Sequence, residues 1–211
     1  MSSKAVKILF VVFLLSLAYS VARYHIFEAV PSKDFALYVM NKCLGLSAFI
    51  LLTLTFALGP VKSLGFDVPD PWLAIRKEIG IVTFAMVLAH VLCSMLIFGS
   101  GAYYAKFFVK GVGMSGIGSW SMLLGVLSFV WLWLYNISFK TLHEGDEKFL
   151  QLITSKGSLI VAGLLSAGHV TVMGFAGWIQ PENWAGGMPP ITLVAFAVFL
   201  VGFTINVIAR R

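Results

Sequence analysis

Charged side chains are scarce in this sequence of 211 residues. Only 11% of the residues are Asp, Glu, Lys or Arg, whereas 59% are hydrophobic and the mean hydropathy is +0.93. A soluble domain of this size covers itself with polar groups and does not carry so much apolar surface. The composition therefore excludes an ordinary soluble domain and predicts an integral membrane protein.

Cysteine is also scarce, and no phosphate-binding fingerprint is present. Cys43 and Cys93 are the only cysteines, too few for a disulfide framework or a zinc motif. They could form one disulfide or remain two buried thiols, and the sequence leaves both alternatives open. No glycine-rich strand–turn–helix pattern occurs, and no loop is long enough to fold a nicotinamide- or flavin-binding domain.

Six apolar stretches are each long enough to cross a bilayer as a helix. They cover about 6–23, 43–60, 78–98, 119–139, 157–178 and 191–208. The first lacks a small-residue cleavage site, so we interpret it as a retained span rather than a signal sequence. We predict a single transmembrane domain over 1–211, an all-α bundle of six helices, with a short surface helix in the aromatic and basic segment 102–118.

The basic residues predict the orientation of the chain. With both termini on the cytoplasmic side, inner segments carry ten Lys and Arg residues and outer segments carry five. The inner ones are Lys4, Lys7, Lys62, Arg76, Lys77, Lys140, Lys148, Lys156, Arg210 and Arg211, and the outer ones are Arg23, Lys33, Lys42, Lys106 and Lys110. The positive-inside rule thus favours an N-in, C-in topology in the plasma (inner) membrane. The net charge of +6 reflects this flanking pattern rather than a nucleic-acid surface.

Two histidines lie within the apolar spans. His90 lies 13 residues beyond Lys77 in the third span, and His169 lies 13 residues beyond Lys156 in the fifth. At ~1.5 Å rise per residue, both imidazoles are ~20 Å along parallel helices, at one depth in the outer half of the membrane. An imidazole in hydrocarbon is costly unless it is paired, so each is a functional candidate. Two at matched depth suit axial ligation of one haem iron by neutral imidazoles.

Other uses of the two histidines stay open. They could bond neighbouring helices in a membrane scaffold or assembly factor, or line the pathway of a transporter or channel that works without haem. A proton relay would usually include carboxylates, and the spans contain none beyond Glu78 at the start of the third. The other histidines, His25 and His143, fall in loops and are expected to be solvated. Small residues that would let a macrocycle approach the helices are Gly163, Gly168, Gly174 and Ala89.

Three stretches carry a family resemblance. They are Leu58-Gly59-Pro60, the run from Arg76-Lys77-Glu78-Ile79-Gly80-Ile81 to His90, and Gly163-Leu164-Leu165-Ser166-Ala167-Gly168-His169. Over the second to sixth spans the chain is similar to the ferric-reductase-like transmembrane superfamily. Within it, the chain most closely resembles the MsrQ-type haem-binding subunits of periplasmic methionine sulfoxide reductase systems. The resemblance implies a bundle that binds b-type haem through His90 and His169 and passes electrons from an inner flavin or quinol to a periplasmic acceptor protein.

The chain departs from this family at the positions of a second ligand pair. Relatives often carry a further histidine on each ligand helix, but position 14 after His90 is Tyr104, and position 13 before His169 is Lys156. We therefore expect one haem. Because no cofactor domain is attached, a separate reductase, free flavin or membrane quinol would supply electrons, and a flavin or quinone could bind in the inner half. The prediction is an electron-transfer subunit of an oxidoreductase rather than a self-sufficient enzyme.

Overall fold

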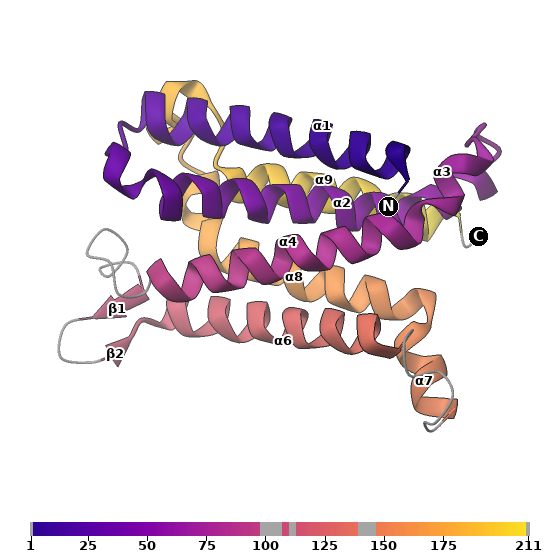
Figure 1. The fold of residues 1–211 in the computed structure, drawn as a ribbon. Helices are drawn as coiled ribbons and strands as arrows, with labels where there is room; N and C mark the ends of the chain where they lie inside the picture. The colour runs from indigo at the N-terminus through magenta and orange to yellow at the C-terminus, as the bar shows by residue number, and fades with distance from the viewer. Residues whose placement is uncertain (1, 98–106, 110–112, 139–146, 210–211) are drawn as a thin grey trace.

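The computed structural model describes residues 2–97, 107–109, 113–138 and 147–209, and nearly all of them are helical. Six helical segments are long and apolar enough to cross a membrane: Ser3–Phe27, Ser32–Ser63, Arg76–Ile97, Gly116–Ser138, Gly157–Trp178 and Ala185–Ile208. They lie side by side in one bundle with both chain ends at the same end of it (Figure 1). We call this the terminal end and the opposite one the distal end. The predicted class is confirmed, and the protein is an all-α multi-pass membrane protein.

At the distal end, the first span ends in π-helix and the second span begins with a 3-10 turn and π-helix. α1 (Ser3–Ser20) continues into a π-helical stretch, Val21–Phe27. A 3-10 turn (Ser32–Asp34) and a π-helical stretch (Phe35–Val39) lead into α2 (Met40–Ser63). The helical segment therefore begins before residue 43, the predicted start of the second span. Polar residues 32–34 read as a loop by hydropathy, but they form the first helical turn, where an acidic side chain such as Asp34 is favourable.

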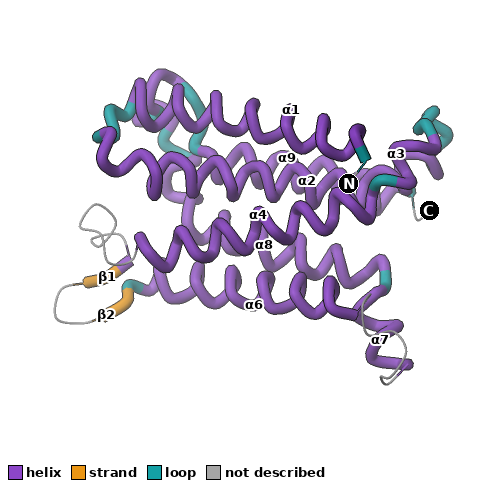
Figure 2. Tube along the Cα trace, viewed as in Figure 1, coloured by secondary structure: helices purple, strands orange, loops and turns teal. Residues whose placement is uncertain are grey.

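The remaining spanning helices are α4 (Arg76–Ile97), α6 (Gly116–Ser138), α8 (Lys156–Trp178) and α9 (Ile191–Ile208). Two short helices, α3 (Asp70–Ala74) and α7 (Glu147–Thr154), lie at the terminal end (Figure 1). At the distal end, β1 (Phe108–Val109) pairs antiparallel with β2 (Gly113–Met114) (Figure 2). Most of the predicted surface helix at 102–118 lies outside the described residues. Of those described, Phe107 is helical, and the strand pair follows, with Gly113 at a φ of +102° that helix excludes.

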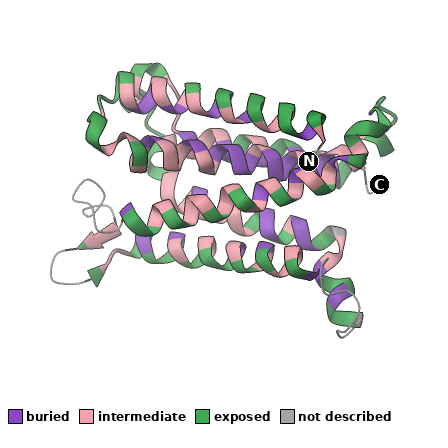
Figure 3. Cartoon of the chain, in the orientation of Figure 1, coloured by how far each residue is buried: buried purple, intermediate pink, exposed green. Residues whose placement is uncertain are grey.

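α2 is the central helix of the bundle. Buried residues make up 56% of its most apolar window, against 11% for α4, and Figure 3 shows the buried positions concentrated along it. The most closely packed helix pairs are α6–α8, α2–α4 and α2–α9. α1 approaches α2 through small buried residues: Ser16, Ser20, Cys43 and Ser47. Small side chains let helix backbones come close in a bilayer, so this contact rests on van der Waals packing.

Pro60 lies inside α2 and removes one hydrogen bond from its backbone ladder. The carbonyl four residues earlier, that of Phe56, therefore lacks its helical donor. Asn206 of α9 supplies one instead, since its Nδ2 donates to the Phe56 carbonyl (3.2 Å) and to that of Gly202 (2.9 Å). One residue earlier along α2, the Thr55 carbonyl accepts from Arg76 Nε of α4 (2.9 Å). Side chains from two neighbouring helices thus bind the backbone of α2 beside its proline.

Candidate functional site

His90 of α4 and His169 of α8 face each other in the distal half of the bundle. Their ring centres are 6.5 Å apart and the ring planes make an angle of 80°. α4 and α8 are not among the closely packed helix pairs, so the rings meet between the α2–α4 pair and the α6–α8 pair. The prediction that both histidines reach one depth is confirmed.

Each histidine is tethered through Nδ1 to a backbone carbonyl of its neighbouring helix. His90 Nδ1 lies 3.1 Å from the Asn41 carbonyl oxygen, and His169 Nδ1 lies 2.7 Å from that of Ser121 and 3.0 Å from the Ser121 hydroxyl oxygen. A carbonyl can only accept, so these contacts assign the proton to Nδ1 and leave a lone pair on Nε2. Asn41 is itself fixed by its Nδ2, which donates to Ser94 Oγ at 3.1 Å. This is the tautomer in which a histidine binds a metal through Nε2 while a backbone oxygen orients the ring.

A glycine follows each accepting carbonyl by four residues. A Cβ at Gly45 would lie 3.3 Å from His90 Nδ1, and a Cβ at Gly125 would lie 3.0 Å from His169 Nδ1. Positions i and i+4 share one face of a helix, so each glycine opens the surface beside the accepting carbonyl. We call each arrangement a histidine seat: residues 41 and 45 on α2 for one ring, and residues 121 and 125 on α6 for the other.

The glycines predicted from the sequence to open this region serve another purpose. They let α8 pack closely on α9 and α6: Gly163 faces Phe199, Gly168 faces Leu124, and Gly174 faces Thr192. Approach of a macrocycle at these glycines stays a prediction. The space for each histidine ring is on the helix that the ring touches, at Gly45 and Gly125.

Replacing Gly125 with leucine is expected to lower stability in detergent by about 1–3 kcal/mol, because the new side chain would overlap the His169 ring. Gly116→Leu on the same helix is the matched control, since an added Cβ there meets nothing within 4 Å. Thermal unfolding followed by size-exclusion chromatography measures the difference. Equal unfolding temperatures for the two variants would show that the seat does not constrain the ring.

α4 contributes few buried side chains in its distal half. The fully buried residues of α4 are Ile79, Thr83 and Ile97, so none lies between residues 84 and 96. His90 and His169 each keep part of their surface exposed. Towards the terminal end, Phe84 of α4 stacks on Phe129 of α6, with ring centres 6.0 Å apart and planes within 8°. The stack lies ~9 Å along α4 from His90, at ~1.5 Å per residue, and bounds the site on that side.

The other residues singled out in the sequence do not join the pair. His25 is half-buried rather than fully solvated, with Nδ1 2.9 Å from the Val30 carbonyl oxygen and its ring edge-on to Phe35. His143 and Tyr104 lie outside the described residues. Cys43 and Cys93 are both free thiols, the first buried and the second half-buried.

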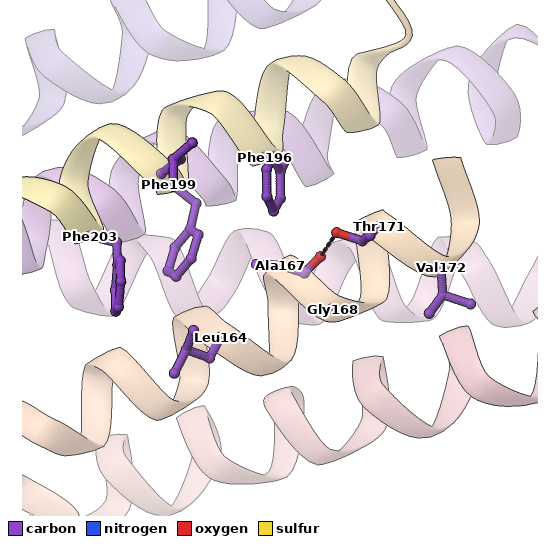
Figure 4. A pocket seen from close by; sticks show the side chains of 9 residues that line it. Leu164, Ala167, Gly168, Thr171, Val172, Phe196, Phe199 and Phe203 are labelled. Atoms are coloured by element: carbon purple, nitrogen blue, oxygen red, sulfur yellow. Dashed lines mark hydrogen bonds between the residues drawn. The ribbon is translucent and has the colours of Figure 1, made fainter. Parts of the chain in front are cut away.

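An apolar cavity of about 400 Å³ lies between α8 and α9 (Figure 4). Its lining comprises Leu164, Ala167, Gly168, Thr171, Val172, Phe196, Phe199, Leu200 and Phe203, and includes neither histidine of the pair. Its polar side chain, Thr171, donates its hydroxyl to the Ala167 carbonyl at 2.7 Å. The cavity is therefore separate from the histidine pair and offers a ligand little beyond apolar contact.

Fold and site together define a multi-pass helical membrane protein with a facing pair of tethered imidazoles. Within the described ranges, no three His, Cys, Asp or Glu side chains group as a metal site would require. No protein-family model matches the chain.

Proposed function

We propose that the protein is a b-type haem membrane protein of the ferric-reductase-like class, similar to the MsrQ-type subunits, with His90 and His169 as axial ligands of one iron. The observation that carries the proposal is the facing pair itself, with ring centres 6.5 Å apart and each Nδ1 held by a carbonyl. A pair of this kind presents two Nε2 lone pairs to the same region of the bundle.

The spacing of the rings fits one metal between them. A metal–nitrogen bond of about 2 Å on each side, with each nitrogen about 1.1 Å from its ring centre, separates the two centres by about 6 Å. The two imidazoles lie 6.5 Å apart by this measure. The sparse burial of α4 between residues 84 and 96 is compatible with a flat ligand beside the rings. The spacing of the two rings therefore supports haem as the ligand of this pair.

The histidines would determine which chemistry such a group performs. When bound, haem supplies an iron that takes up and releases one electron at a time. His90 and His169 would occupy both axial positions, which favours electron transfer over oxygen binding. The Asn41 and Ser121 carbonyls would fix both ring orientations and make the ligating nitrogens more basic.

The direction of electron flow follows from the proposed topology. With the terminal end cytoplasmic, a separate flavin- or quinol-based donor would deliver electrons at that end, and an acceptor protein would take them at the distal, periplasmic end. The Phe84–Phe129 stack lies between the terminal end and the histidines on this route. A reporter fused after Arg211 is expected to be cytoplasmic, and an external reporter would reverse the direction.

The test is an absorption spectrum of the purified protein, first oxidised and then reduced with dithionite. A Soret band with sharp low-spin bands on reduction, and one haem per chain by pyridine haemochrome assay, is the expected result. A protein that stays colourless after expression with added haem precursor would overturn the proposal. It would favour the transporter or scaffold alternatives, which need no haem.

A further inference from the structure

Two cationic side chains gather around Tyr24 at the distal end. Lys42 Nζ lies 4.6 Å from the centre of the Tyr24 ring and 4.3 Å from that of Tyr38, and Arg23 Cζ lies 5.2 Å from the Tyr24 ring. Tyr24 is only 5% exposed, and its hydroxyl accepts from the Ile191 amide at 3.1 Å. Ring faces attract cations, so the two tyrosines hold the ammonium group in place.

Part of the Arg23 guanidinium has no hydrogen-bond partner. The residue is 6% exposed, and its Nη1 donates to the carbonyls of Ala185 and Met188. Its Nε is buried and has no hydrogen-bond partner. The nearby carboxylate of Glu28 accepts from Tyr38 on the exposed side. A buried donor of a charged group is costly when unpaired, so the centre of the distal end favours an anion.

Lys42 also adjoins the histidine pair. Lys42 directly follows Asn41, whose carbonyl accepts from His90. Gly45, three residues further along α2, lies beside the same ring. The ammonium group therefore belongs to the segment of α2 that forms one histidine seat. Haem carries two propionate carboxylates on one edge, and charged groups in a bilayer turn towards the nearer interface. For a haem on this pair, that interface is the distal one.

We propose that Lys42 binds a propionate carboxylate of the haem, with the buried guanidinium of Arg23 adding to the positive potential there. The inference rests on the proposed function and deepens it, because it fixes which edge of the macrocycle faces the distal end. Lys42 is the direct partner because it lies on the segment of α2 next to Asn41, whereas Nη1 of Arg23 already donates to two backbone carbonyls. A charge-assisted hydrogen bond of this kind contributes strongly where water is scarce.

The experiment compares ferric protoporphyrin IX with its dimethyl ester, which has the same ring and iron but no carboxylates. Full-length protein prepared without haem is titrated with each compound in detergent, for the wild type, Lys42→Met and Lys33→Met. Lys33 is an exposed distal lysine on the 3-10 turn, so it controls for loss of one positive charge. Lys42→Met is expected to weaken binding of the free acid about tenfold or more and leave the ester unchanged. Lys33→Met should change neither.

Each other outcome has a definite meaning. Equal weakening of acid and ester by Lys42→Met would overturn the inference and leave Lys42 as a structural residue or a partner of lipid headgroups. No change with either compound would also overturn it, while the haem proposal would stand. A wild type that binds neither compound would refute the proposed function itself.

Discussion

Under the haem proposal, the His169→Ala variant is expected to lose most of the bound haem, with at least a tenfold drop in Soret absorbance per chain. Loss of an outer partner of a metal-bound histidine typically costs about 10–100-fold in affinity, so loss of the ligand should cost no less. His90→Ala should behave in the same way, because the two rings face each other and are proposed as ligands of the same iron. The measurement is the spectrum and haem content of membranes normalised to protein amount.

Imidazole added to the growth and purification buffers should restore part of the absorbance in either variant. The alanine leaves a space of the right size next to the seat, and free imidazole can fill it as a ligand. Two controls keep the number of histidines equal: His25→Ala, whose ring bonds Val30, and His143→Ala in the polar segment. Full haem content in both ligand variants, or its loss in the controls alone, would refute the assignment of His90 and His169.

Asn206→Leu is expected to destabilise the bundle by about 1–3 kcal/mol, since it leaves the Phe56 carbonyl without a donor in an apolar surrounding. Pro60→Ala in the same chain should remove most of that cost, because residue 60 would then donate to Phe56 as in an ordinary helix. The two substitutions should therefore be coupled by about 1–2 kcal/mol in a double-mutant cycle. Denaturation of the purified protein in mixed micelles gives the four free energies.

Thr204→Leu is the matched control for the polar-to-apolar change on α9, because Thr204 is exposed. It should have little effect in either background. Additive costs for Pro60→Ala and Asn206→Leu would mean that the amide does not replace the missing backbone bond, and that Asn206 stabilises α9 only through Gly202.

The fold could be predicted from the sequence because bilayer thickness sets a minimum apolar length, and six stretches meet it. The boundaries were less accurate where polar residues belong to a helix, as at Ser32–Asp34. Hydropathy measures the cost of residues in lipid, not the backbone hydrogen bonds that define where a helix begins.

The histidine pair could be predicted because titratable groups are rare in apolar spans and the two lie equally far from their lysines. The seats could not. Their acceptors are backbone oxygens, which every residue has, and their glycines at 45 and 125 are on helices whose proximity to α4 and α8 is a tertiary fact. In the same way, Pro60 predicts that the Phe56 carbonyl lacks its helical donor. The sequence does not predict that Asn206, far along the chain, supplies that donor.

The use of backbone oxygens as acceptors has a consequence for how the site can change during evolution. Any amino acid at 41 or 121 supplies the same carbonyl, so the acceptor itself survives substitution there, although the Asn41 amide also bonds Ser94 and the Ser121 hydroxyl lies 3.0 Å from His169 Nδ1. The restriction falls one helical turn later, at 45 and 125, where even a methyl group would crowd the ring. Diverged versions of this protein should therefore be traced by a small residue on one helix and a histidine on the next, rather than by the residue that bonds the histidine.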